Sequence, residues 1–146
     1  MPTRIDPSEH SQQIYQLFQA AYRVEADLIG VQSFPPLERS AQEIGRSESY
    51  FYGEFHMGEL AAVIETEAAP GANKNDILSL AVAPSSARQG LGMKLVQFIL
   101  QSSSEVVVTT AYKNQPAIQL YQKLGFAIVR EFDTPEQIVM VEMSYS

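Results

Sequence analysis

The chain has no cysteine. This absence excludes disulfide bonds, a catalytic thiol and a thiolate metal site, so the core must be stabilised by packing alone. Basic residues are also in deficit, since 10 Lys and Arg stand against 17 Asp and Glu and the net charge is −7. The deficit argues against a broad surface for nucleic acid or an anionic membrane, and it mildly favours a cationic small-molecule partner.

Long apolar segments are absent as well. The longest apolar run, residues 60–64, is too short to span a bilayer, and the N-terminus lacks the apolar core of a signal peptide. We therefore expect a cytoplasmic protein with no membrane partner. With 146 residues, 45% of them hydrophobic and 18% charged, the chain has a globular composition and the length of one domain, residues 1–146.

Hydrophobic periodicity and turn residues predict alternating strands and helices. Helices are expected from Pro7 to about Ala26, over 37–44, at about 90–101 and over 116–125. Strands are expected at 3–5, in a hairpin over 49–66, and at 77–83, 105–110, 127–132 and 138–143, with loops at 29–36 and 68–75. The unit over 77–110 implies a parallel strand pair. We therefore predict an α/β or α+β fold with a mixed, mostly antiparallel central sheet and flanking helices.

Two motifs in the second half of the chain contain the main candidate functional residues. The first, residues 87–92, reads Ala-Arg-Gln-Gly-Leu-Gly, follows an apolar strand and opens a helix. Unpaired N–H groups at a helix start bind anions such as phosphate, and glycine lets the anion approach without a Cβ. The motif is not a Rossmann fingerprint, because Leu95 occupies the third glycine position, and it is not a P-loop, because no Gly-Lys-Ser/Thr follows.

The second motif, residues 114–126, reads Asn-Gln-Pro-Ala-Ile-Gln-Leu-Tyr-Gln-Lys-Leu-Gly-Phe. It places the amide of Asn114, the small Ala117 and the phenol of Tyr121 on a short helix that Gly125 ends. Together and in this order, the two motifs resemble the GNAT superfamily of acyl-CoA-dependent N-acyltransferases. The motif-bearing resemblance covers residues 77–126, about a third of the chain, and the order of the other elements agrees with it.

The resemblance implies a GNAT-like fold in which two parallel strands, 77–83 and 105–110, splay apart. It implies that acetyl-CoA binds there, with its pyrophosphate on the glycine loop, where Arg88 and Lys94 add positive charge. By the same resemblance the cofactor-binding residues are Ala81, Val82, Ala83, Arg88, Gln89, Gly90, Leu91, Gly92, Met93, Asn114, Ala117 and Tyr121. The family usually has Arg or Gln three residues before the first loop glycine, whereas this chain has Ala87, and the departure affects one phosphate contact.

For catalysis, the resemblance implies direct attack of a primary amine on the thioester in a ternary complex, with no metal and no covalent intermediate. Tyr121 is expected to be the general acid, because a phenol with a pKa near ~10 stays protonated at neutral pH and can donate to the leaving CoA thiolate. The alternative interpretation of Tyr121 is a core tyrosine. A backbone N–H of strand 77–83 is expected to polarise the carbonyl.

The sequence offers several candidates for the base that deprotonates the amine. Some relatives have Glu five residues before the motif Asn, where this chain has Thr109, and others have a carboxylate fourteen residues before the first loop glycine, which is Asp76 here. We expect Asp76 to take this role, with a solvated carboxylate as the alternative. Glu65, Glu54 and a water molecule are further candidates, because strand parity does not fix which face is buried. The two histidines lack metal-ligand spacing, and no metal is expected.

The acceptor site is expected between the first two helices and near the motif helix. Tyr22, Glu25, Phe34 and Tyr112 could hold an ammonium group there by charge and cation–π contact. We therefore predict acetyl transfer to a primary amine of a small molecule. Two alternatives stay open: acetylation of a protein N-terminus or lysine, which needs an open peptide groove, and a non-catalytic module that senses acyl-CoA. A homodimer is also left open.

Overall fold

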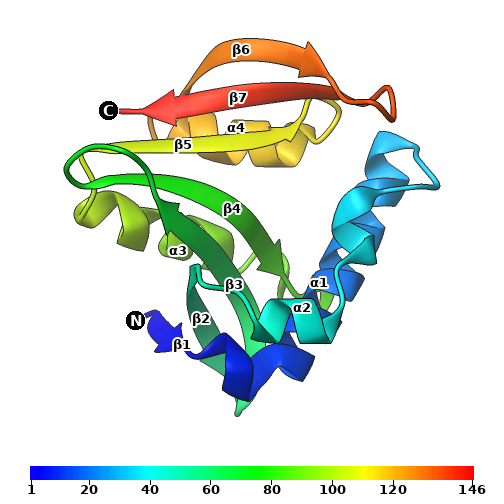
Figure 1. Ribbon diagram of the computed structural model, residues 1–146, viewed down its shortest axis with the longest axis vertical. Helices are drawn as coiled ribbons and strands as arrows, with labels where there is room; N and C mark the ends of the chain where they lie inside the picture. Colours follow the sequence, from blue (N-terminus) through cyan, green and yellow to red (C-terminus); the bar gives the residue numbers. More distant parts are fainter.

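The computed structural model describes residues 1–146, and its strands form one sheet in the order β1-β2-β3-β4-β5-β7-β6 (Figure 1). The strands are β1 (Thr3–Ile5), β2 (Tyr50–His56), β3 (Glu59–Ala68), β4 (Lys74–Val82), β5 (Glu105–Ala111), β6 (Ala127–Asp133) and β7 (Val139–Tyr145). The helices are α1 (Pro7–Ile29), α2 (Ala41–Gly45), α3 (Leu91–Gln101) and α4 (Gln115–Lys123), with 3₁₀ turns η1 (Pro35–Glu38) and η2 (Pro84–Ser86). All neighbouring strands are antiparallel except β4 and β5, which confirms the predicted mixed sheet.

The parallel contact between β4 and β5 is short, and we call it the seam. It consists of four residue pairs, from Lys74 with Glu105 to Ile77 with Val108. Both strands continue past the last pair without bonding to each other, and Figure 1 shows them diverging. The predicted splayed strand pair is therefore present.

A β-bulge in β4 lies directly beside the end of the seam. Thr66 of β3 pairs with Ile77, and the preceding Glu65 pairs with Ser79, so Leu78 has no partner in β3. A bulge bends its strand and increases the local twist. The bend accounts for the departure of β4 from β5 at this residue.

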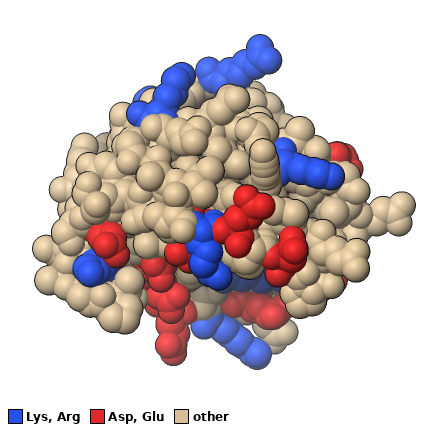
Figure 2. All heavy atoms as spheres, turned by 90° about the horizontal axis from the view of Figure 1, so that it is seen from above, with Lys and Arg blue, Asp and Glu red and all other residues tan.

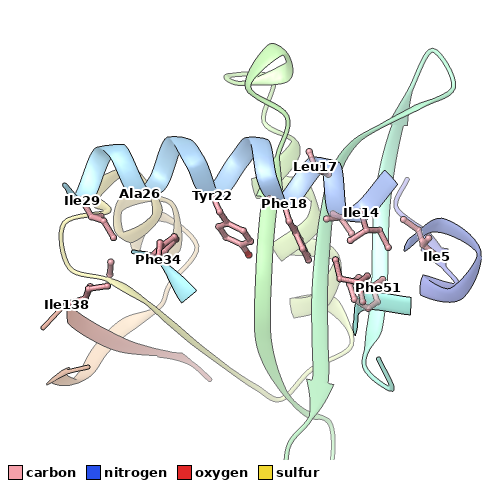
Figure 3. Packing of buried hydrophobic residues seen from close by; sticks show 14 residues of the cluster. Ile5, Ile14, Leu17, Phe18, Tyr22, Ala26, Ile29, Phe34, Phe51 and Ile138 are labelled. Carbon is pink, nitrogen blue, oxygen red and sulfur yellow. The ribbon is translucent and has the colours of Figure 1, made fainter. Parts of the chain in front are cut away.

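Helices cover both faces of the sheet. Along α1, the buried residues Ile14, Phe18 and Tyr22 face the strands, and Figure 3 shows Ile14 above Phe51 and Tyr22 near Phe34 in one apolar cluster. On the other face α3 and α4 contribute to a second cluster. Since both faces are covered, residues 61–66 of β3 are all buried instead of alternating between buried and exposed.

The first helix has cap geometry at both ends. Asp6 accepts a hydrogen bond from the Ser8 N–H at 2.9 Å, and Gly30 ends the helix in the left-handed region with φ 77°. The helix reaches Ile29 instead of the predicted Ala26, so its last turn also packs into the first cluster.

The predicted helix over residues 37–44 ends where expected, at Gly45, but its predicted start is wrong. Pro35 and Pro36 begin a 3₁₀ turn, and a new helix starts only at Ala41. The reason is a capping box, in which Ser40 Oγ accepts from the Glu43 N–H at 3.1 Å and the Glu43 carboxylate accepts from the Ser40 N–H at 2.9 Å.

The remaining elements lie close to their predicted positions. β4 begins at Lys74 instead of Ile77, and β5 and β7 extend to Ala111 and Tyr145. The hairpin of β2 and β3 turns through residues 57–58, inside the predicted hairpin over 49–66. None of the helices combines the length and the apolar character needed to cross a membrane.

Candidate active site

A cavity of about 340 Å³ lies where β4 and β5 separate. Its walls come from α1, η1, β4, β5, α4 and the turn that joins β6 to β7. Leu78 and Ser79 line it from β4, and Thr109 lines it from β5. Past the seam, β4 has no strand partner on its β5 side, so this edge offers unpaired backbone groups. The cavity therefore combines a free strand edge with walls of side chains.

Residues that the sequence places far apart meet at this cavity. Tyr22 and Glu25 come from adjacent turns of α1, and Phe34 precedes η1. Asn114, Ala117 and Tyr121 come from α4 and its N-cap. Two groups of predicted site residues, one for the acceptor and one for acetyl-CoA, thus line the same space.

Tyr121 reaches the cavity from α4. The residue is 3% exposed, and its hydroxyl has no hydrogen-bond partner in the protein. Because every fully buried side-chain oxygen and nitrogen has a partner, this hydroxyl must reach the open space of the cavity. The ring packs against Phe126 with centroids 5.2 Å apart. Burial raises the pKa of Tyr121, and nearby Tyr22 and Glu25 act in the same direction, so the phenol stays protonated at neutral pH.

Glu25 supplies a half-buried carboxyl group to the cavity. Burial raises the pKa of Glu25, and the neighbouring Asn114 amide opposes the shift. Burial likewise raises the pKa of Tyr22, which is 9% exposed. Glu136 is a second acidic lining residue, and no Lys or Arg lines the cavity. These charges favour a cationic ligand over an anionic one.

Asn114 has a structural role that leaves part of its side chain free. Its Oδ1 accepts a hydrogen bond from the Ala117 N–H at 3.3 Å and caps α4. The residue is 9% exposed and lines the cavity beside Glu25, so its amide NH₂ is shared between the Glu25 carboxylate and a ligand.

The predicted phosphate loop lies between β4 and α3, outside the cavity. The N–H groups of residues 88–93 donate to no backbone carbonyl, and Lys94 is the first of α3 to bond, to the Gly90 carbonyl at 3.0 Å. Arg88 and Gly90 have positive φ values of 68° and 75°, and no atom lies within 4 Å of the position of a Gly90 Cβ. Free N–H groups at an open helix N-terminus are typical of a phosphate site.

Gly92 serves packing more than anion approach. A Cβ at this position would lie 3.5 to 3.8 Å from the side chains of Leu120, Val82 and Leu80. These are ordinary contact distances, so the buried position has room for a methyl group but not for a larger side chain between α3, β4 and α4. Its N–H group is nevertheless one of those in residues 88–93 that donate to no backbone carbonyl.

Asp76 lies outside the cavity. It sits in the seam, paired with Val107 of β5 and with Glu67 of β3. Burial raises the pKa of its carboxyl, and the charges of Glu142 and Glu105 add to the shift. Its role as a base stays a prediction.

Other predicted residues also lie away from the cavity lining. Tyr112 follows β5 and is 45% exposed. Ala81, Val82 and Ala83 lie at the end of β4 that leads to the glycine loop, and Arg88 is exposed within that loop.

The sequence analysis missed one wall of the cavity. Thr134, Glu136, Ile138 and Met140, in and after the turn between β6 and β7, line it. The available signal was the apolar Ile138 directly after a turn sequence that contains Pro135. An apolar residue in a turn indicates that the turn packs against another part of the molecule, and Ile138 is 8% exposed in the cluster under α1.

The face that Figure 2 shows carries mixed charge. Lys and Arg side chains lie apart from one another, and Asp and Glu side chains lie among them. On β6 and β7, for example, Arg130 pairs with Glu142 at 3.3 Å. This face therefore has no continuous basic surface of the kind that binds a nucleic-acid backbone.

Comparisons with known proteins identify the family. The model of the Acetyltransferase (GNAT) family matches residues 11–126, and the chain belongs to this family. The UPF0157 protein YqkA of Bacillus subtilis (strain 168) is 33% identical over 109 residues, which cover 73% of this chain and 31% of that protein. The peptidyl-lysine N-acetyltransferase YiaC of Escherichia coli (strain K12) is 40% identical over 53 residues, 36% of each chain.

The chain therefore matches about a third of the length of these curated relatives. Among solved structures, an N-acetyltransferase from Staphylococcus aureus Mu50 has a TM-score of 0.76 at 13% identity, covering 99% of this chain and 100% of that one. The likeness confirms the predicted GNAT-like fold.

Proposed function

We propose that the protein transfers an acetyl group from acetyl-CoA to a primary amine of a small molecule, by direct attack of the amine in a ternary complex. The observation that carries the proposal is the Tyr121 hydroxyl, which has no protein partner and opens into the cavity beside the seam. Family membership supports the reaction class, and this phenol supports the proton transfer that the reaction requires.

The acetyl-CoA site in this proposal extends from the glycine loop to the cavity. The free N–H groups of residues 88–93 and the exposed Arg88 suit the pyrophosphate. The unpaired edge of β4, toward Ala81 and Val82, suits the amides of the pantetheine arm, which would bond to it like an added strand. Asn114 and Ala117 lie at the cavity end of this path.

The acceptor in this proposal binds on the α1 side of the cavity. Tyr22 and Phe34 meet edge to face, with centroids 6.2 Å apart, and provide an apolar wall. Glu25 attracts the ammonium form of the amine, and the absence of Lys and Arg from the lining leaves this charge without a competing cation. We infer an acceptor with an amino group on an apolar body.

The chemical step follows from these placements. The bound ammonium loses one proton to Glu25 or to a water beside it, and the neutral nitrogen attacks the thioester carbonyl, which a free N–H of β4 polarises. The nitrogen of the resulting tetrahedral adduct loses a second proton to solvent, and Glu25 then releases its own proton to solvent. A C–N bond forms, the C–S bond breaks, and the thiolate takes the Tyr121 proton. Tyr121 then regains a proton from solvent, so the products are the N-acetyl amine and CoA.

Acetylation of a peptide amine is the second candidate, because YiaC, a peptidyl-lysine N-acetyltransferase, is similar over 53 residues. Release of CoA thiol should be measured with small amines, a lysine peptide and a peptide with a free N-terminus. We expect the highest kcat/KM with small apolar amines. A higher value with either peptide would favour the second candidate, and CoA binding without turnover of any amine would indicate a sensor.

The Gly90 position allows a matched test of the phosphate loop. Asp and Asn both tolerate positive φ, so Gly90→Asp and Gly90→Asn differ in charge with almost the same shape. A carboxylate among the free N–H groups repels the pyrophosphate, and we expect Gly90→Asp to bind CoA about tenfold more weakly than Gly90→Asn. Calorimetric titration at low salt measures the difference. Equal affinities in the two variants would remove the loop from the site.

A further inference from the structure

One buried carboxylate has no part in the proposed reaction. Glu65 of β3 is 2% exposed, and Arg39 donates to both of its oxygens, from Nη1 at 2.7 Å and from Nη2 at 3.0 Å. The hydroxyls of Ser49 and Ser79 donate to it at 2.6 and 2.9 Å. Burial acts to raise the pKa of Glu65, but these hydrogen bonds and the charge of Arg39 outweigh it, and the pKa lies below its ordinary value. The carboxylate is therefore ionised and fully occupied, which argues against the base role considered for Glu65.

This carboxylate links two walls of the cavity. Ser79 lines the cavity and directly follows the bulge in β4. Arg39 directly follows η1, whose Pro35 and Pro36 line the cavity as well. The Arg39 Nη2 group also donates to Ser47 Oγ at 2.6 Å. The ion pair thus connects η1 to β3, and the hydrogen bond from Ser79 extends the connection to β4, the strand that lines the cavity.

Apart from this ion pair, the η1 turn is attached mainly through Leu37, whose side chain packs against the first apolar cluster. None of its residues is buried, and its start has no side-chain cap. Phe34, 6% exposed, anchors the residue before it, and Gln19 of α1 donates to the Leu37 carbonyl at 2.9 Å. The end of η1 depends on Arg39 and its partner Glu65.

A buried ion pair often adds little net stability, because desolvation of two charges offsets their attraction. A two-point contact between a guanidinium and a carboxylate nevertheless fixes distance and orientation closely. We propose that Glu65 and Arg39 are a positioning pair, which sets the spacing between η1 and β4 and thereby the shape of the acceptor side of the cavity. The kinetic consequence rests on the proposed function, whereas the attachment of η1 does not.

Limited proteolysis tests the attachment without any acceptor. Trypsin needs the Arg39 side chain free of its partner, so Glu65→Gln should speed cleavage after residue 39 by about tenfold. Cleavage after Arg88, exposed in the glycine loop, is the internal reference and should keep its rate. Glu67→Gln changes an exposed carboxylate on the same strand and serves as the matched control.

A second variant covers the case in which Glu65→Gln destabilises the whole fold and speeds cleavage at both positions. Arg39→Lys keeps a positive charge and a trypsin site, but its single ammonium cannot bridge both oxygens of Glu65. We expect cleavage after residue 39 to rise about tenfold relative to cleavage after Arg88.

Steady-state kinetics with an acetylated amine separates positioning from stabilisation. Both variants should raise the KM for the amine about fivefold and leave the KM for acetyl-CoA unchanged. A pair that only stabilised the fold would lower the active fraction, and hence the apparent kcat, with both KM values unchanged. That result, or unchanged cleavage after residue 39 in both variants, would overturn the proposal. If no amine is acetylated, the proposed function fails, and the proteolysis alone then tests whether the Glu65–Arg39 pair holds η1 in place.

Discussion

Replacement of Tyr121 by phenylalanine should lower kcat for acetyl transfer about 100-fold, which corresponds to about 2.7 kcal/mol of lost transition-state stabilisation. The reason is that the thiolate loses its proton donor, while the ring that packs against Phe126 is retained. CoA affinity and melting temperature should therefore change little. Stopped-assay or continuous detection of CoA thiol at saturating amine measures kcat, and calorimetry measures the affinity.

Tyr145→Phe is the matched control for this variant. Tyr145 packs against the same Phe126 ring, with centroids 5.7 Å apart, and it does not line the cavity. Loss of its hydroxyl should leave kcat unchanged. If Tyr121→Phe turned over like the wild-type protein, the phenol would be a packing group and not the acid.

Glu25→Gln should lower kcat/KM for a cationic amine about 30-fold, through KM because the ammonium loses its half-buried counter-charge, and through kcat where Glu25 and not a water accepts the proton. The pH dependence of amine binding gives a second test of the same role. Burial raises the pKa of Glu25, so in the wild-type protein amine binding should decline as pH falls through a value above that of an ordinary glutamate. The Glu25→Gln variant should have a high KM for the amine at every pH, and this KM should not rise further as the pH falls. The measurement is KM for the amine against pH.

Asp76→Asn distinguishes the two candidate carboxylates in the same assay. Burial and neighbouring acids raise the pKa of Asp76 too, but this residue lies in the seam and not in the cavity lining. We expect Asp76→Asn to keep the wild-type pH profile. If Asp76→Asn instead lost activity at low pH and Glu25→Gln did not, Asp76 would be the base, as the sequence analysis predicts.

The parts of the site that the sequence predicts are those specified by local patterns. Free N–H groups follow from a glycine at a helix start, and Asn114 and Tyr121 occupy one side of a short helix because of their spacing. The start predicted for the helix over 37–44 is wrong, because the 3₁₀ turn at Pro35 and Pro36 and the Ser40 capping box outweigh the weak apolar pattern.

Non-local features could not be predicted in this way. The strand parity that places Glu65 toward Arg39 depends on register, and β3 is buried on both faces, so alternation gives no signal there. The bulge at Leu78 depends on how β3 and β4 pair, and no residue type marks it. The wall from Glu136 to Met140 depends on how the last hairpin packs under α1, which only the folded chain determines.

The short seam also bears on how the molecule moves. Only the four pairs from Lys74–Glu105 to Ile77–Val108 join the two halves of the sheet by strand pairing, and a further backbone bond, from Ser104 to the Asn73 carbonyl at 2.7 Å, lies at the same end. Past these pairs, only side-chain contacts hold the two halves of the sheet together. A separation of the two halves at the cavity end would therefore break side-chain contacts but no strand-to-strand hydrogen bond, so this end is the part of the sheet where opening costs least.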